Sequence, residues 1–137
     1  MYIPASKQQL LQLHEVGQFH ADIGFVVDDR LVSAYELDAD DDEMAEFAAM
    51  QEAAEYAHSS APAVVIVVAA DIADGLSGAE AAPGEVRLES PVTLSEVASM
   101  HVGAASPGAT AAATQVDASE LGWWAVQELP ALLTSLE

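Results

Sequence analysis

Two aspartates that follow the most apolar segment of the chain are the first candidates for chemistry. Asp71 and Asp74 come directly after Val64–Ala70, a run that is apolar on both faces, as in a strand buried within a sheet. The carboxyl end of such a strand is where α/β enzymes place acids that hold a metal or abstract a proton. Asp-x-x-Asp-Gly is also a common turn, because aspartate side chains accept hydrogen bonds from nearby N–H groups. The pair therefore has two interpretations, a divalent-metal or metal-dependent catalytic site and a turn.

A second acidic group has the alternating spacing of a calcium loop. Asp38, Asp40 and Asp42 could direct oxygens at one hard cation, as alternate residues of an EF-hand do. The sixth position, which needs glycine, is Glu43, and the twelfth, which needs a bidentate carboxylate, is Ala49. We interpret the group as the acidic start of a helix, where the helix dipole favours negative charge.

Adjacent tryptophans near the C-terminus are the clearest sign of a partner. Trp123 and Trp124 are the two tryptophans of the chain, and neighbours on a strand point to opposite faces. One side chain is expected in the core and the other at a surface, where Gln127 and Glu128 would supply a polar rim. The alternative is that both tryptophans lie in the core.

Other familiar motifs fail. Gly75-Leu76-Ser77-Gly78-Ala79 lacks the last glycine of a nucleophile elbow, no phosphate-binding glycine loop is present, and there is no cysteine. The histidines have no metal-ligand spacing. They are His14, His20, His58 and His101. The sequence thus assigns no catalytic residue and no cofactor.

The N-terminal half should supply two strands and three helices. A strand over residues 2–5 is stopped by Pro4, and a helix follows that Ser6 and Gln9 cap and Gly17 ends. Residues 21–27 have the composition of a strand, and Asp28 and Asp29 cap a short helix. The longest helix should cover residues 41–58 with a capping box of Asp40 and Glu43. Its expected apolar stripe is Met44, Phe47, Ala48, Ala54 and Ala57.

The C-terminal half should be richer in strands. The buried strand 64–70 leads into a loop over 71–84, a half-exposed strand near 86–88 and a capped turn at 93–96. A strand over 98–102, an alanine-rich helix over 108–116, an extended segment at 122–126 and a helix around Pro130 complete the chain. This order predicts an α/β fold, with α+β left open. We expect one layered domain over residues 1–137, a mixed sheet packed by helices.

Charge limits the partners. The chain has 23 acidic and 3 basic residues and a net charge of -20. Nucleic acid and anionic membranes are excluded as partners because binding them depends on Lys and Arg, and here those are Lys7, Arg30 and Arg87 alone. The start lacks the pattern of a signal peptide and the longest apolar run is half a membrane span, so we expect a soluble, cytoplasmic protein.

Several segments resemble those of an uncharacterised family of small acidic proteins from actinobacteria. They are Tyr2-Ile3-Pro4-Ala5, Val64–Asp71, Val97–Val102 with His101, and Trp123–Pro130. The resemblance covers the whole chain. It implies a cytoplasmic actinobacterial protein and no assigned activity, catalytic residue or cofactor.

The functional expectation is a non-enzymatic protein-protein interaction or regulatory module that contacts an unidentified protein through Trp123, Trp124, Gln127 and Glu128. One alternative is the metal site of Asp71 and Asp74. Another is an acidic mimic of DNA, which would need carboxylates in rows at phosphate-like spacing. Whether the chain forms a homo-oligomer is left open.

Overall fold

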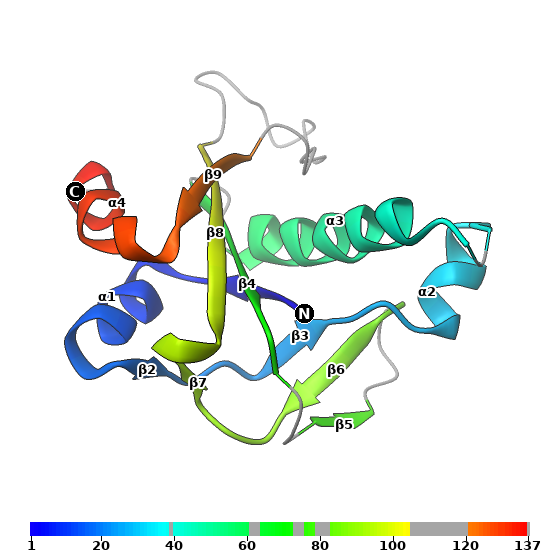
Figure 1. Ribbon diagram of the computed structural model, residues 1–137, viewed down its shortest axis with the longest axis horizontal. Helices are drawn as coiled ribbons and strands as arrows, with labels where there is room; N and C mark the ends of the chain where they lie inside the picture. The colour runs from blue at the N-terminus through cyan, green and yellow to red at the C-terminus, as the bar shows by residue number, and fades with distance from the viewer. Residues whose placement is uncertain (39, 61–63, 73–75, 79–82, 105–120, 137) are drawn as a thin grey trace.

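The fold is built on one large antiparallel sheet that helices cover on both faces (Figure 1). A computed structural model describes residues 1–38, 40–60, 64–72, 76–78, 83–104 and 121–136. The seven strands of the sheet lie in the order β5-β6-β3-β1-β4-β8-β9. Their bounds are β1 Tyr2–Ala5, β3 Ile23–Phe25, β4 Val64–Ala70, β5 Leu76–Gly78, β6 Glu85–Leu88, β8 Val97–Ala104 and β9 Gly122–Ala125.

Helices α1 (Lys7–Val16) and α4 (Leu129–Ser135) pack on one face of the sheet. Helices α2 (Asp29–Ala34) and α3 (Asp42–Ser60) belong to the other face. A two-stranded sheet of β2 (Gln18–Phe19) and β7 (Val92–Thr93) lies beside α1. Two short 3-10 helices, η1 (Leu94–Glu96) and η3 (Val126–Glu128), precede β8 and α4.

Strand β4 is buried on both faces, as its uninterrupted apolar run predicts. Ile66 and Val68 contact the side chains of α1 and α4, while Val65 and Val67 contact α3. The strand pairs with β1 along four residues and with β8 along its whole length. Each face of β4 therefore belongs to a different hydrophobic cluster, and β4 ties the two clusters together.

Proline in β1 opens the sheet on one side. The N–H of Ala70 donates to the C=O of Met1 at 2.9 Å, so by strand alternation Ile3 and Ala5 also bond toward β4, while Tyr2 and Pro4 face β3. Pro4 has no N–H to offer β3. Strands β1 and β3 accordingly pair only at Tyr2 and Phe25. The predicted strand over residues 2–5 is confirmed, and its pairing with β4 continues through Pro4 to Ala5.

Local sequence signals placed most helix ends correctly. Ser6 and Gln9 form the expected capping box, and Gly17 ends α1 with a left-handed φ of 88°. Asp28 caps α2 through the N–H of Leu31. The cap of α3 is one residue later than predicted, because the Asp41 carboxylate accepts from the N–H of Met44 at 3.2 Å.

Helix α3 packs through its alanines. The buried side chains are Ala45, Ala48, Ala49, Ala53, Ala54 and Ala57. Met44, which the predicted stripe included, is exposed instead. Because alanine side chains are small, the helix axis lies close to the sheet. Large apolar side chains of the sheet, such as Phe25, then fill the space between the sheet and the helix.

The predicted combination of helices packed on a sheet is confirmed, and the strand directions differ from the expected mixture. Every described strand pair is antiparallel, which is the arrangement of the α+β class. The predicted loop over 71–84 contains the short edge strand β5. The predicted helix over 108–116 lies outside the described residues. No described helix is long and apolar enough to cross a membrane.

Candidate functional site

The adjacent tryptophans lie on β9, an edge strand of the large sheet, and point to opposite faces. Trp124 is half-buried and packs against the cluster beneath α1 and α4. Trp123 has 63% of its surface exposed, the second largest exposed fraction among the large hydrophobic residues described. The structure thus places one tryptophan half-buried against the core cluster and the other at the surface, as expected from strand alternation.

At Trp123 the backbone N–H and C=O groups of β9 point away from the sheet. The N–H of Ala125 donates to the Glu128 carboxylate at 2.9 Å and so points away from β8. By alternation, the N–H and C=O of Trp123 point away from β8 as well. Among the described residues no strand pairs with this outer side of β9. Glu128 therefore covers one end of the edge and leaves Trp123 as its exposed centre.

Behind Trp123 lies a serine-histidine pair that the sequence analysis missed. His101 is opposite Trp123 in the register of β8 and β9, and its Nε2 lies 3.1 Å from Ser99 Oγ. Burial lowers the pKa of His101, so the imidazole is neutral at pH 7. The Ser-x-His spacing within a strand was the available signal, since residues two apart share a face.

This pair does not have the geometry of a nucleophilic centre. Ser99 is only 8% exposed, and within the described part of the chain no carboxylate is bonded to the other nitrogen of His101. A serine nucleophile needs an accessible Oγ and a third group that orients the base. We interpret Ser99 and His101 as a satisfied polar pair that supports the β9 edge.

The predicted metal pair is only partly described. Asp71 is exposed at the end of β4, and its N–H donates to the C=O of Glu96 at 2.8 Å. Asp74 lies outside the described residues. Within the described ranges, no three histidine, aspartate or glutamate side chains come together as metal ligands. The metal site of Asp71 and Asp74 stays a prediction.

Two acid-tyrosine contacts that are partly buried lie around α3. The Tyr35 hydroxyl donates to Glu52 Oε1 at 3.0 Å. Burial first, and then the neighbouring Glu55 and Glu85, raise the pKa of Glu52, while the Tyr35 hydrogen bond lowers it. Burial and a hydrogen bond with Glu46 likewise raise the pKa of Tyr2 to about 12. These contacts hold α3 against β1 and α2.

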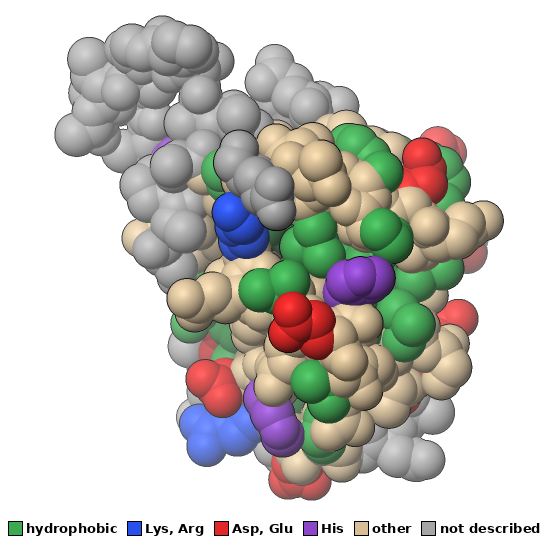
Figure 2. Space-filling view, turned by 90° about the vertical axis from the view of Figure 1, so that its left-hand side faces the viewer, with side chains coloured by type: hydrophobic (Ala, Val, Ile, Leu, Met, Phe, Trp, Pro, Cys, Tyr) green, Lys and Arg blue, Asp and Glu red, His purple; other side chains and the backbone are tan. Residues whose placement is uncertain are grey.

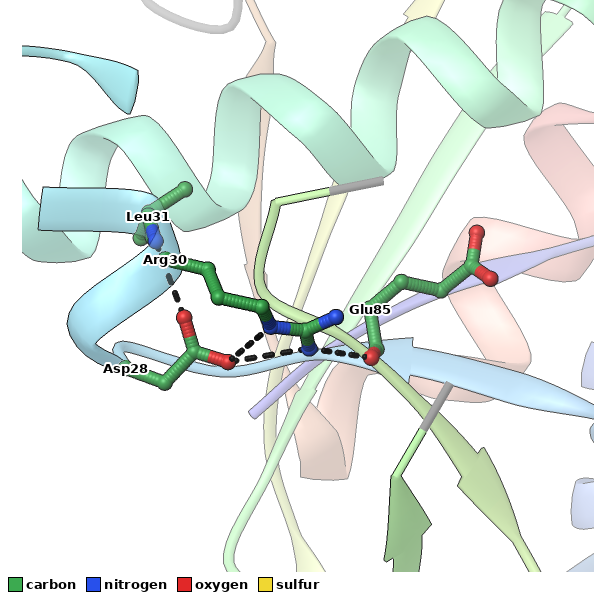
Figure 3. A network of polar contacts seen from close by, with 4 residues as sticks. All are labelled: Asp28, Arg30, Leu31 and Glu85. Atoms are coloured by element: carbon green, nitrogen blue, oxygen red, sulfur yellow. Dashed lines mark hydrogen bonds and ion pairs between the residues drawn. The ribbon is translucent and has the colours of Figure 1, made fainter. Parts of the chain in front are cut away.

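Arg30, one of the three basic residues of the chain, is held by neighbouring groups near the start of α2. Arg30 binds the Asp28 carboxylate at 3.0 Å and donates to the backbone C=O of Glu85 at 2.8 Å (Figure 3). The side chain of Glu85 points away from Arg30 (Figure 3) and is 8% exposed. The strand predicted near 86–88 to be half-exposed is exposed only at Arg87, because Glu85 is buried together with Val86 and Leu88. Segments distant in sequence cover β6, and the alternation of residues along the strand does not reveal them.

Negative charge is concentrated at one end of the fold. The exposed residues around the start of α3 include Asp40, Asp41, Asp42, Glu43 and Glu46. The opposite end, which Figure 2 shows, has hydrophobic side chains over its middle with individual acidic and histidine side chains between them. The acidic cluster at the start of α3 therefore lies at the end of the molecule away from α1 and α4.

Comparison with known proteins places the chain in a family without assigning it a function. A search of the curated proteins found no match, and neither did a search of the solved structures. Residues 1–133 match the model of a family of unknown function, DUF6912, and the chain belongs to that family.

Proposed function

We propose that this member of DUF6912 is a non-enzymatic interaction module that binds a basic protein through the edge of β9, with Trp123 as the anchor. The observation that carries the proposal is the exposure of Trp123 beside a tryptophan that packs, half-buried, against the core. Tryptophan is enriched among the residues that dominate binding energy at protein interfaces. An exposed tryptophan with no packing role within the described chain is expected to have a role outside it.

The edge supports the tryptophan with main-chain groups. The outward N–H and C=O of Trp123 would pair with one residue of an extended partner segment, as in recognition by strand addition. Glu128 occupies the N–H of Ala125 and so limits the length of that pairing. Limited pairing favours a partner that adds side-chain contacts to a short strand over one that extends the whole sheet.

Charge indicates the class of partner. A net charge of -20 repels acidic surfaces and attracts basic ones, and it accelerates the encounter with them at low salt. Glu128 and the polar Gln127 lie next to β9 and would form the rim of the contact. A second copy of this chain would bring the same negative charge, which opposes self-association. A basic protein segment is the occupant that fits both the edge and the charge.

The test compares Trp123→Ala with Val27→Ala, a control that shortens another exposed apolar residue away from β9. Wild type and both variants serve as bait in a lysate of the source organism, and recovered proteins are identified by mass spectrometry. A basic protein retained by wild type and Val27→Ala is then purified and titrated. We expect Trp123→Ala to weaken its binding at least about tenfold.

Equal binding by Trp123→Ala and wild type would contradict the proposal. Circular dichroism melts of all three proteins accompany the titration, because an unfolded Trp123→Ala variant would make the residue structural and would also contradict it. Trp124→Ala is expected to destabilise the fold by about 2 kcal/mol, since it removes half-buried packing.

The alternative is a divalent-metal site on Asp71 and Asp74, and a thermal-shift series separates it from the interaction module. A metal that binds only the folded state raises Tm. A rise with Mg²⁺, Mn²⁺ or Ca²⁺ beyond that of NaCl at equal ionic strength, lost in Asp71→Asn, would favour the metal site.

A further inference from the structure

A pocket of about 160 Å³ opens where β1 and β3 diverge. Its walls come from the end of β1, the start of α1, the start of β3 with the residue before it, and the last turns of α3. The lining residues are Pro4, Ala5, Ser6, Gln9, Asp22, Ile23, Tyr56 and Ala57. The pocket exists because Pro4 cannot bond to β3. It lies away from Trp123, on strands three and more positions removed from β9.

The start of α1 does not make this pocket an anion site. Helix N-termini bind anions through N–H groups that have no partner within the helix. Here the N–H of Ser6 donates to Gln9 Oε1 at 2.8 Å, and the N–H of Gln9 donates to Ser6 Oγ at 3.2 Å. Two of the available donors are thus already used by the helix's own capping box.

The remaining charge in the pocket is negative. Asp22 is exposed, and its backbone is held in place because its C=O accepts from the N–H of Leu88 at 2.9 Å. The neighbouring segment is held as well, since Gln9 Nε2 donates to the C=O of His20 at 2.7 Å. The last turns of α3, a helix of 19 residues, form another wall. A helix C-terminus carries partial negative charge and favours a cation.

An aromatic ring completes the wall. Tyr56 is 44% exposed, and its ring lies 6.2 Å from that of Phe25, centroid to centroid, at an angle of 55°. That contact holds the ring in place from the core side. Tyr56 and Asp22 line the same pocket, and an aromatic ring together with a carboxylate is a favourable environment for an organic cation.

We propose that the pocket binds a small organic cation, an ammonium or guanidinium group on a short hydrocarbon stem. Asp22 would pair with the charge and the Tyr56 ring would contact it, while Pro4, Ile23 and Ala57 would contact the stem. A metal cation is a poorer occupant, because Asp22 is the one carboxylate among the lining residues described. This site is separate from the β9 edge and does not depend on the function proposed above.

The test uses butylammonium, with butanol and butyrate as neutral and anionic probes of the same length. Each probe is titrated into the ¹⁵N-labelled protein, and amide shifts are followed at residues 20–25 and 56–57. We expect butylammonium to bind with a Kd on the order of 1 mM, because a ligand of so few atoms binds weakly. Butanol and butyrate should bind at least about fivefold more weakly.

Matched variants distinguish the pocket from a general attraction between cations and an acidic protein. Asp22→Asn and Tyr56→Leu should each weaken butylammonium binding severalfold. Asp38→Asn removes an exposed carboxylate outside the pocket and should leave the affinity unchanged. Trp123→Ala should also leave it unchanged, so that this proposal and the interaction module can fail separately.

Two results would overturn the cation site. One is equal binding of butylammonium to wild type and Asp22→Asn. The other is a set of amide shifts spread over the start of α3 and absent from the pocket residues. The tripeptide Ala-Lys-Ala is a further probe, which tests whether the bound cation is a lysine side chain of a protein or a free amine. Binding tighter than that of butylammonium would identify a protein lysine as the cation, and weaker binding would identify a free amine.

Discussion

Glu52 shows how a single residue limits the stability of this acidic fold. Its carboxylate accepts from Tyr35, yet burial and the neighbouring Glu55 and Glu85 raise its pKa above the ordinary value of 4.5. Between 4.5 and the raised pKa, the folded state therefore holds more protons than the unfolded state. Stability from this residue is greatest at low pH and is lost as the pH rises through the pKa of the folded state.

Glu52→Gln should therefore stabilise the protein at pH 7. Glutamine keeps an oxygen that can accept from Tyr35 and removes the charge, so we expect a gain of up to about 1 kcal/mol in the free energy of unfolding. The gain should shrink as the pH falls through the raised pKa of the native carboxyl, because the carboxyl then takes up a proton itself. Urea denaturation across this pH range measures it. The control Glu15→Gln, at an exposed position of α1, should show no such trend.

Individual residues were predictable where the interaction is local. Ser6 and Gln9, three residues apart, cap α1 as expected because both partners belong to the same helix turn. Glu85 and the Ser99–His101 pair were missed. Burial of Glu85 depends on elements distant in sequence, and a Ser-x-His spacing does not by itself show that the two side chains bond to each other.

At the scale of elements, two glycines with similar backbone angles have different surroundings. Gly17 ends α1 with φ 88° and has no atom within 4 Å of the position of an added Cβ. Gly84 precedes β6 with φ 78°, and a Cβ there would lie 2.6 Å from the backbone oxygen of Val26. That oxygen belongs to a backbone segment fixed by the 2.9 Å hydrogen bond from Val26 N–H to Gly84 C=O.

Replacing each glycine by alanine separates backbone strain from steric collision. Gly17→Ala should lower the free energy of unfolding by about 1 kcal/mol, the cost of a left-handed residue with a side chain. Gly84→Ala should cost about 3 kcal/mol or more, because β3 and β6 must also move apart. Chemical denaturation of both variants gives the difference. Equal losses in the free energy of unfolding would mean that the backbone at Val26 moves away from the new Cβ without a loss of stability.

Elements were more predictable than their arrangement. Apolar runs and caps located β4, α1, α2 and the extended start of the C-terminal segment, since these signals are contained within each segment. Strand direction and order depend on contacts between distant segments, so the fully antiparallel order was not predictable. The position of Trp123 at the surface was predictable only in part. Alternation required one tryptophan on each face but did not say which one was covered.

For the whole molecule, net charge is the dominant electrostatic property. A charge of -20 on one chain repels itself in the folded state, and the described ion pairs include only that of Arg30 with Asp28. The exposed carboxylates at the start of α3 are close together, where repulsion is strongest. Dissolved ions screen this repulsion.

Stability should therefore rise with salt. We expect Tm to increase by about 5 °C between about 10 mM and about 500 mM NaCl. KCl should give the same increase at equal ionic strength, because screening depends on ionic strength and not on the identity of a monovalent cation. Calorimetry in both salts measures it. An unchanged Tm would mean that the carboxylates are too far apart to repel one another appreciably.

The single proline in β1 also divides the sheet into two mechanical parts. Strands β1, β4, β8 and β9 are joined by long ladders, whereas β3, β6 and β5 join them through one residue pair. Opening that seam breaks fewer backbone hydrogen bonds than opening any other junction along the β1–β9 part. Across this seam the two parts are held together mainly by side chains, because Phe25 of β3 and Leu88 of β6 belong to the hydrophobic clusters on the two faces of the sheet.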